Sequence, residues 1–320
     1  MSRFNNFMPS GVIPATLLAF NKDFSIDEPS TRAHLKHVGN VAGISAITVN
    51  GHASEVHACG KSEQRRILDI SLDEVGDKLP LINGVWADGS HQAAQIAKWS
   101  EAAGASCLLV FPPQPIMMMQ GQMKAEMGLA HFETIAAASD LPIIAFQYPL
   151  EQGYRMETLH RMIEKIPNLV AIKDWNMGQI HEQHVRELQS SVRPFNVLTT
   201  NSAWLMSSLT MGARGLLSGS GSVIADLQVA LFNAIQKGDL KQAQKINDRI
   251  YPTAKCFYGP PATDMHNRMK EALVMLGRMP NALVRPPLVK LTEAELKDVR
   301  QAIDDAGLSY EGADILRHAA

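Results

Sequence analysis

Eight short apolar runs, separated by longer amphipathic stretches, are the feature that most constrains how this 320-residue chain can fold. The runs are GVIPATLL (11–18), GISAITVN (43–50), LPLINGVW (79–86), ASCLLVF (105–111), LPIIAFQY (141–148), NLVAIK (168–173), FNVLTT (195–200) and RGLLSGS (214–220). Nearly continuous apolar runs that alternate with helices are typical of parallel strands buried on both faces. Eight such units predict an α/β fold, a (β/α)8 TIM barrel. A doubly wound open sheet is the alternative, but no G-x-G-x-x-G motif follows the first run.

The alternation stops after residue 236. Three helical patterns follow with no apolar strand between them, at 239–258, 264–278 and 292–307. We therefore predict a barrel that carries the active site over residues 1–235. A helical C-terminal domain over 236–320 would pack on the barrel and be available for contacts between subunits.

Charge and composition exclude several classes of function. The chain has 30 basic and 32 acidic residues, a net charge of −2, so nothing attracts nucleic acid or an anionic membrane. Its 3 cysteines are too few and too scattered for a disulfide framework or a zinc site. No signal peptide is evident, and no run of ~18 apolar residues could span a membrane. We predict a cytoplasmic protein.

The sixth run ends in a lysine, Lys173, directly after the apolar residues 169–172. Lysine is almost never fully buried without a partner or a role. Strand alternation places Ala171 and Lys173 on one face, which we expect to point inward, and Asp174 on the face toward the helices. Active sites of TIM barrels lie at the carboxyl ends of the strands. Lys173 is therefore a candidate catalytic residue.

A lysine in this position can serve as a Schiff-base nucleophile toward a carbonyl substrate. Attack requires a neutral amine, and lowering its pKa from ~10.4 to ~7–8 costs roughly 4 kcal/mol, which desolvation can supply. The alternative is a lysine that caps the strand and reaches solvent. The residues alone do not choose between the two.

Several segments, in order along the chain, resemble the dihydrodipicolinate synthase/N-acetylneuraminate lyase family of class I aldolases. GVIPATLLAFN (11–21) is similar to the family's opening strand and Thr-Pro-Phe turn, and GHASE (51–55) to its Gly-Thr-Thr-Gly-Glu. AFQYP (145–149) is similar to its Tyr-Asn-x-Pro strand end, AIKD (171–174) to its Schiff-base segment, and RPPL (285–288) to a C-terminal stretch. The resemblance implies a barrel with a helical C-terminal domain, a homo-oligomer (tetramer or dimer), and an imine between Lys173 and a 2-oxo acid such as pyruvate. It implies no metal and no cofactor beyond that imine.

The departures from the family pattern are as informative as the matches. The family's proton-relay tyrosine corresponds to Phe146, and its two motif threonines correspond to His52 and Ala53. Gln114 stands where a relay tyrosine often follows the fourth strand, and the arginine that binds a second carboxylate falls near Glu151. We infer a divergent member of the family that is not a true dihydrodipicolinate synthase.

Two residues are candidates to replace the missing relay tyrosine. Tyr148 lies two positions beyond Phe146, on the same strand face and ~6.6 Å further along. His52 has an ordinary pKa of ~6.5, which suits general acid–base catalysis. We therefore predict Tyr148 and His52 as catalytic residues beside Lys173. The alternatives are a Tyr148 that only packs and a His52 that only bonds a loop carbonyl.

Substrate contacts are expected from the ends of the first, second, fifth and eighth runs. Thr16 ends the first strand and is placed to bond a substrate carboxylate or the relay. SGSGS (218–222) precedes a helix expected near residue 223, and such a turn presents N–H groups to an anion. We read Glu55 as a structural partner for backbone amides. The predicted substrate-binding residues are Thr16, Gly51, Ala53, Phe146, Ser218, Gly219 and Ser220.

Three other features we interpret as structural or leave open. HEQH (181–184) lacks the four-residue histidine spacing of zinc peptidases and reads as a solvated helix face. IMMMQGQM (116–123) fits a subunit contact, a pocket mouth or core filling. Trp175 either walls the pocket or fills the top of the barrel.

The resulting hypothesis is a class I lyase, either an aldolase or a dehydratase, that acts on a small 2-oxo acid. Phe146 and Gln114 at the relay positions favour an alternative, a non-catalytic 2-oxo acid binding protein or an inactive paralogue. The presence of Lys173 argues against that alternative, because a binding pocket gains little from a desolvated amine.

Overall fold

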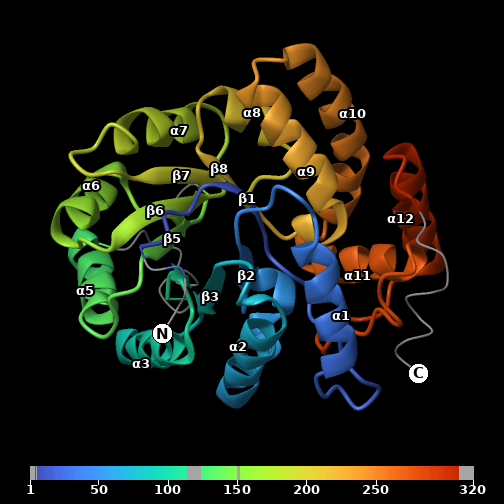
Figure 1. Ribbon diagram of the computed structural model, residues 1–320, viewed down its shortest axis with the longest axis horizontal. Coiled ribbons are helices and arrows are strands. Elements are labelled where there is room, and N and C mark those ends of the chain that lie inside the picture. Colours follow the sequence, from blue (N-terminus) through green and yellow to red (C-terminus); the bar gives the residue numbers. More distant parts are fainter. Residues whose placement is uncertain (1–3, 5, 114–123, 150–151, 310–320) are drawn as a thin grey trace.

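The computed structural model describes residues 4, 6–113, 124–149 and 152–309, and its centre is an eight-stranded parallel sheet rolled into a barrel (Figure 1). Around the barrel the strands run in the order β1-β8-β7-β6-β5-β4-β3-β2. Isolated bridges from Val12 to Ile44 and from Ala15 to Thr48 close the gap between β1 and β2. The strands are β1 (Gly11–Pro14), β2 (Ile47–Val49), β3 (Leu81–Val85), β4 (Cys107–Val110), β5 (Ile143–Gln147), β6 (Leu169–Asp174), β7 (Asn196–Thr199) and β8 (Gly215–Ser218). The predicted (β/α)8 barrel is confirmed, although every strand except β6 is shorter than its apolar run.

The two faces of each strand pack against different neighbours. Ile144 of β5, Ala171 of β6 and Leu198 of β7 belong to one buried cluster together with Phe146. Ile172 of β6 belongs to a second cluster, formed with side chains of the surrounding helices. Alternation along β6 therefore turns Ala171 and Lys173 toward the barrel interior, as predicted.

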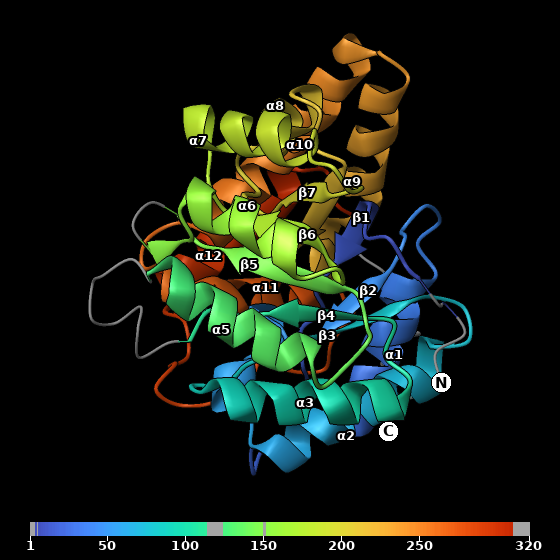
Figure 2. The same cartoon turned by 90° about the vertical axis from the view of Figure 1, so that its left-hand side faces the viewer.

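Helices cover the outside of the barrel. Figure 2 shows α3, α5 and α6 side by side along the strands. The helix expected near residue 223 begins at Gly221, within the SGSGS segment and two residues before the expected start. The helices of this layer are α1 (Glu28–Gly39), α2 (Lys61–Val75), α3 (Ser90–Ala103), α5 (Ala125–Ala136), α6 (Met156–Lys165), α7 (Gly178–Gln183) with the π-helical turn His184–Leu188, α8 (Leu205–Thr210) and α9 (Gly221–Gln236).

The chain after the barrel is helical, as the sequence predicts. It forms α10 (Leu240–Phe257), α11 (Met265–Met275) and α12 (Glu293–Asp305), which lie together at one side of the barrel next to α9 (Figure 1). The domain boundary at 235/236 falls at the end of α9 and stays a prediction. None of the helices in the described ranges is both long and apolar enough to cross a membrane.

Local capping explains where two of these helices begin. The Asp239 carboxylate accepts a hydrogen bond from the backbone N–H of Gln242, 2.9 Å away, at the start of α10. Thr292 and Glu295 form a reciprocal capping box at the start of α12, in which each side chain bonds the other residue's N–H. Both caps satisfy N–H groups that a first helical turn leaves without partners.

Candidate active site

Lys173 lies at the end of β6 and is buried inside the barrel mouth, with 5% of its surface exposed. It stands in register with Phe146 of β5 and Leu198 of β7. Its Nζ lies 4.0 Å from the centroid of the Phe146 ring. Burial lowers the pKa of Lys173 from 10.5 to about 7, because the ammonium form loses its hydration. The alternative of a lysine that reaches solvent is therefore wrong, and a large fraction of the amine is neutral at pH 7.

A cavity of about 40 Å³ lies over the lysine. The barrel contributes Ala15, Phe146 and Lys173 to its wall, and residues of α11 close it from the C-terminal side. Trp175 belongs to this wall, so of its two predicted roles it lines the pocket. The other lining residues are His52, Ala53, Thr200, Gly219, Tyr258, Met265 and Met269.

The two candidate relay residues meet beside this cavity. The Tyr148 hydroxyl and His52 Nε2 lie 2.9 Å apart, within hydrogen-bond distance. Tyr148 also contacts the Phe146 ring, at 4.6 Å between centroids, so both lie on one strand face as predicted. The structure thus brings together Lys173, His52 and Tyr148, residues separated by up to 121 positions (173 minus 52) along the chain.

The surroundings of His52 differ from the expectation of an ordinary imidazole. Aromatic rings surround it, with centroids 4.9 Å away for Phe111 and 5.4 Å away for Trp86. Burial, reinforced by the nearby charge of Lys173, lowers the pKa of His52 well below 6.5. The ring is therefore neutral at pH 7, and in this form one ring nitrogen can accept a proton while the other can donate one. The main-chain carbonyl of His52, not its ring, accepts a hydrogen bond from His266 Nε2 at 2.5 Å.

A buried ion pair anchors the turn that carries His52. Glu55 ends this turn with a left-handed backbone, φ 52°, and is completely buried. Its carboxylate accepts hydrogen bonds from Lys270 Nζ at 2.5 Å and from the backbone N–H of Arg285 at 3.0 Å. The amide partner agrees with the structural role inferred for Glu55. Lys270 could not be inferred, because it lies 215 positions away.

In the eighth-strand turn, two of the N–H groups predicted to face an anion bond protein oxygens instead. The Ser220 N–H donates to the Tyr258 hydroxyl at 3.0 Å, and the Ser222 N–H donates to the Gly219 carbonyl at 3.0 Å. These two N–H groups are therefore not free to hold an anion, because protein oxygens already occupy them. The hydroxyl of Ser218 bonds those of Ser202 and Ser220, at 2.8 and 2.9 Å.

The predicted substrate-binding residues divide into two groups. Ala53, Phe146 and Gly219 line the cavity over Lys173. Thr16, Gly51, Ser218 and Ser220 lie outside the lining formed by the described residues. The Thr16 hydroxyl instead points to the Thr48 carbonyl, 3.4 Å away. Gln114, Glu151 and the segment 116–123 lie outside the described residues.

Both histidines of the HEQH segment are buried, so the interpretation of these two residues as a solvated helix face is wrong, whereas Gln183 between them is exposed. His181 and His184 each place Nδ1 2.7 Å from the same oxygen of Asp174, on the outward face of β6. Burial opposes ionisation of Asp174, but the two histidine hydrogen bonds outweigh it and hold the pKa of this carboxyl below its usual value. Asp174 thus faces the helices, as predicted.

The same network extends to Ser208, whose hydroxyl lies 2.6 Å from His181 Nε2. The order Ser208–His181–Asp174 matches that of a hydrolase triad. All three residues are 0% exposed, so no substrate carbonyl can reach the hydroxyl. Within the described ranges, no group of three or more His, Cys, Asp or Glu side chains is placed to bind a metal.

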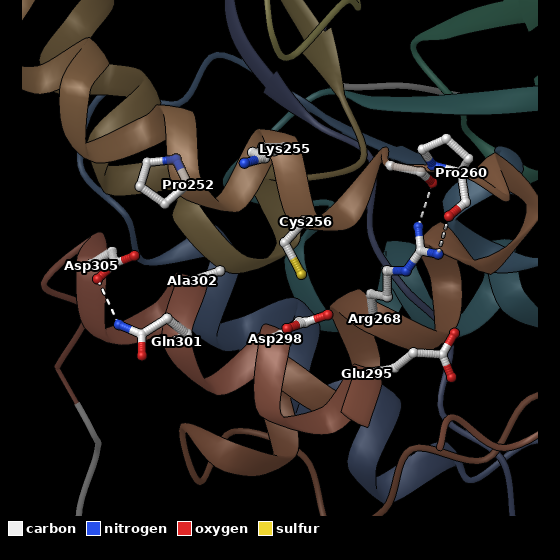
Figure 3. Close-up of a pocket in the computed structure, with 11 residues that line it drawn as sticks. Pro252, Lys255, Cys256, Pro260, Arg268, Glu295, Asp298, Gln301, Ala302 and Asp305 are labelled. Atoms are coloured by element: carbon white, nitrogen blue, oxygen red, sulfur yellow. Dashed lines mark hydrogen bonds between the residues drawn. The ribbon is translucent and has the colours of Figure 1, made fainter. Parts of the chain in front are cut away.

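A wider pocket of about 820 Å³ adjoins the Lys173 cavity, and we call it the vestibule. The two share His52, Trp175, Thr200, Tyr258 and Met265. A third pocket, of about 410 Å³, lies apart from the lysine between α10, α11 and α12 (Figure 3). The Arg268 side chain at its edge donates to the carbonyls of Gly259 and Pro260, at 2.5 and 3.1 Å (Figure 3). That guanidinium therefore braces the turn after α10.

Comparison with known proteins places the site in context. The family model described as Dihydrodipicolinate synthetase family matches residues 8–306. A 4-hydroxy-tetrahydrodipicolinate synthase from Methanopyrus kandleri is 26% identical over 309 residues, which cover 96% of this chain and 99% of that protein. The putative 2-dehydro-3-deoxy-D-gluconate aldolase YagE from Escherichia coli is 24% identical over 300 residues, with coverages of 92% and 97%. A crystal structure of YagE in complex with pyruvate superposes with a TM-score of 0.85 at 22% identity, covering 93% of this chain and 99% of that one.

Proposed function

The chain belongs to the Dihydrodipicolinate synthetase family and is a lyase of the aldolase type, and from this premise we propose that Lys173 forms an imine with a 2-oxo acid. The observation that carries the proposal is the buried amine at the end of β6, whose pKa burial lowers to about 7. YagE, which shares this fold, is described in complex with pyruvate. Imine formation requires a neutral amine that a carbonyl substrate can reach. Lys173 meets this requirement at the inner end of a pocket that widens outward.

The chemical steps follow from the residues around the amine. Lys173 Nζ attacks the C2 carbonyl carbon, the carbonyl oxygen leaves as water, and a protonated imine remains. The iminium then accepts the electron pair released when a bond at C3 breaks, which yields an enamine. The same intermediate serves aldol cleavage, aldol addition and loss of water. No cofactor beyond this covalent imine takes part in the proposal.

Tyr148 and His52 are the proposed proton relay. Their 2.9 Å hydrogen bond joins a phenol to a neutral imidazole, so a proton can pass in either direction. Both rings contact Phe146, whose own ring lies against Lys173 Nζ. The pair would deliver the proton that lets water leave, in place of the tyrosine that position 146 lacks.

We further propose that the reaction is not dihydrodipicolinate synthesis. The relay tyrosine of the family corresponds here to Phe146, which has no hydroxyl group. The two motif threonines correspond to His52 and Ala53. The cytoplasmic location and the homo-oligomer that the resemblance implies stay predictions.

Borohydride trapping tests the proposal directly. Protein incubated with pyruvate and borohydride should gain the mass of a reduced adduct, and peptide mass spectrometry should locate it on Lys173. Lys270 is an internal control, since it is equally buried but is held by the Glu55 carboxylate. Absence of any adduct across a panel of 2-oxo acids would sink the imine mechanism and favour a non-catalytic binding protein.

The relay has its own arm in the same experiment. Tyr148→Phe and His52→Gln should still be trapped on Lys173, but imine formation and turnover should slow by about 10²-fold or more. Unchanged rates in both variants would remove the relay while leaving the imine in place.

A further inference from the structure

The vestibule is the part of the site that no step of the proposed chemistry uses. Its volume of about 820 Å³ compares with about 40 Å³ for the cavity over Lys173, so the reacting carbons fill little of the total space. A pocket of this size matches the range of small-molecule binding sites. The part of the substrate beyond C3 has to extend into it, because the shared wall residues join the two spaces.

The wall of the vestibule is mainly apolar. Its apolar side chains come from the loop after β6, from α11 and from the segment 287–289 that follows α11. They include Trp175, Met177, Met265, Pro287, Leu288 and Val289. Burial of a hydrocarbon or aryl group against these side chains is favourable, whereas a carboxylate placed against them would lose hydration. The lining also includes the uncharged polar residues Thr200, Asn201, Ser202 and Thr263.

The described residues of this wall carry few charges. The described lining residues include one lysine, Lys255, and one acidic residue, Asp264. Lys255 lies on the exposed side of α10, where solvent screens its charge. The remaining titratable groups include His57 and His266, and burial lowers the pKa of both imidazoles below 6.5. Both are therefore neutral at pH 7.

From this wall and its continuity with the Lys173 cavity, we propose that the substrate is a 2-oxo acid whose distal part is apolar and uncharged, such as a branched alkyl or aryl group. The inference rests on the proposed imine function and adds the class of the substrate's tail. The carboxylate and the keto group would lie at the lysine end, and the tail would lie against Trp175 and Met265. For the aldol direction the same reasoning specifies an apolar aldehyde as the partner of the enamine.

A matched pair of 2-oxo acids tests the tail directly. 5-Methyl-2-oxohexanoate and 2-oxoglutarate have the same number of heavy atoms, and differ by an isopropyl group in place of the distal carboxylate. The measured quantity is the concentration that half-saturates borohydride trapping on Lys173, with pyruvate as the reference without a tail. We expect this concentration to be at least about tenfold lower for 5-methyl-2-oxohexanoate than for 2-oxoglutarate.

The outcomes separate the two proposals. If pyruvate traps Lys173 but 2-oxoglutarate saturates at an equal or lower concentration than 5-methyl-2-oxohexanoate, the apolar tail is overturned and the imine function stands. If none of the three acids is trapped, the proposed function fails first. Calorimetric titration of Lys173→Ala with the same pair then decides the tail alone, and tighter binding of 2-oxoglutarate would overturn it.

A charge inserted in the vestibule supplies a second test. Met177 lines the vestibule and is 57% exposed, so Met177→Arg adds a cation there without disturbing the core. We expect the preference for the apolar acid to fall by about threefold. Val192→Arg is the matched control, since Val192 is 93% exposed and precedes β7 at the opposite end of the barrel. Equal preference ratios in the two variants would contradict the proposed place of the tail.

Discussion

At the scale of the residue, the proposed chemistry depends on the pKa of Lys173. An ordinary lysine is almost entirely charged at pH 7, and a charged amine cannot attack a carbonyl. Burial at the end of β6 lowers the pKa of Lys173 to about 7. The same burial, with the nearby lysine charge, keeps His52 neutral. The two groups thus have the protonation states that the proposed nucleophilic attack and proton transfer require.

The pH dependence of imine formation should report the lysine alone. The rate of borohydride trapping with pyruvate should rise with pH through about 7, where Lys173 loses its proton, and level off above. His52 should add no inflection near 6.5, because its pKa lies well below that value. An inflection near the ordinary lysine value of 10.5 would show that the amine is solvated.

Stability provides a control that does not depend on catalysis. The folded-state pKa of Lys173, about 7, lies below its ordinary value of 10.5, so the unfolded chain binds the extra proton between these pH values. The free energy of unfolding of the wild type should therefore rise with pH across this window relative to Lys173→Met. At pH 7 and below, Lys173→Met should be the more stable protein by roughly a few kcal/mol, measured by urea denaturation.

At the scale of the element, β6 carries a different role on each face. Its inward side places Lys173 in the cavity, and its outward side places Asp174 against the α7 segment. The carboxylate accepts hydrogen bonds from His181 and His184, and from the backbone N–H of Asn176 at 3.0 Å. This network holds the end of β6, and hence the backbone that orients the lysine.

Removing the charge from this network should destabilise the fold. Asp174→Asn replaces one carboxylate oxygen by an NH2 group, which cannot accept a hydrogen bond, so either the two imidazoles or the Asn176 N–H lose their acceptor. We expect the free energy of unfolding to fall by about 3 kcal/mol, measured by urea denaturation. Glu182→Gln is the matched control, because its ion pair with Arg186 lies on the exposed side of the same segment and is worth about 1 kcal/mol or less. Equal losses in the two variants would refute a structural role for the buried carboxylate.

At the scale of the whole molecule, the C-terminal helices complete the barrel's active site. Lys270 of α11 bonds Glu55, and His266 bonds the carbonyl of His52. Tyr258, at the end of α10, lines the cavity, and its hydroxyl accepts a hydrogen bond from the Ser220 N–H. The turn that carries His52 is therefore held between β2 and α11.

Breaking the buried ion pair should be costly. Lys270→Met leaves the Glu55 carboxylate buried, with the Arg285 N–H as its remaining described partner, and should lower the free energy of unfolding by about 3–5 kcal/mol. The double variant Glu55→Gln/Lys270→Met should recover much of this loss, because it removes the uncompensated charge. Denaturant titration of the wild type, Lys270→Met and the double variant measures both changes, and a Lys270→Met protein as stable as the wild type would contradict the proposed anchoring.

What could be read from the sequence was local and periodic. The eight apolar runs specify parallel strands because buried strands need apolar side chains on both faces, and the helical patterns after residue 236 specify α10, α11 and α12. A two-residue period places Phe146 and Tyr148 on one face and turns Lys173 away from Asp174. These inferences required no knowledge of which residues distant in the sequence come into contact.

Only the tertiary structure decided which polar groups find partners. The sequence pattern of His181 and His184 is typical of a solvated face, but both bond the buried Asp174. In the SGSGS turn, Tyr258 takes up the N–H of Ser220, which the sequence alone could not indicate. Hydrogen-bond partners and burial depend on chain segments brought together from up to 215 positions apart, so a local pattern cannot encode them. The sequence by itself predicts the barrel and the candidate lysine, whereas the lowered pKa of Lys173, the Tyr148–His52 hydrogen bond and the vestibule arise only from the tertiary structure.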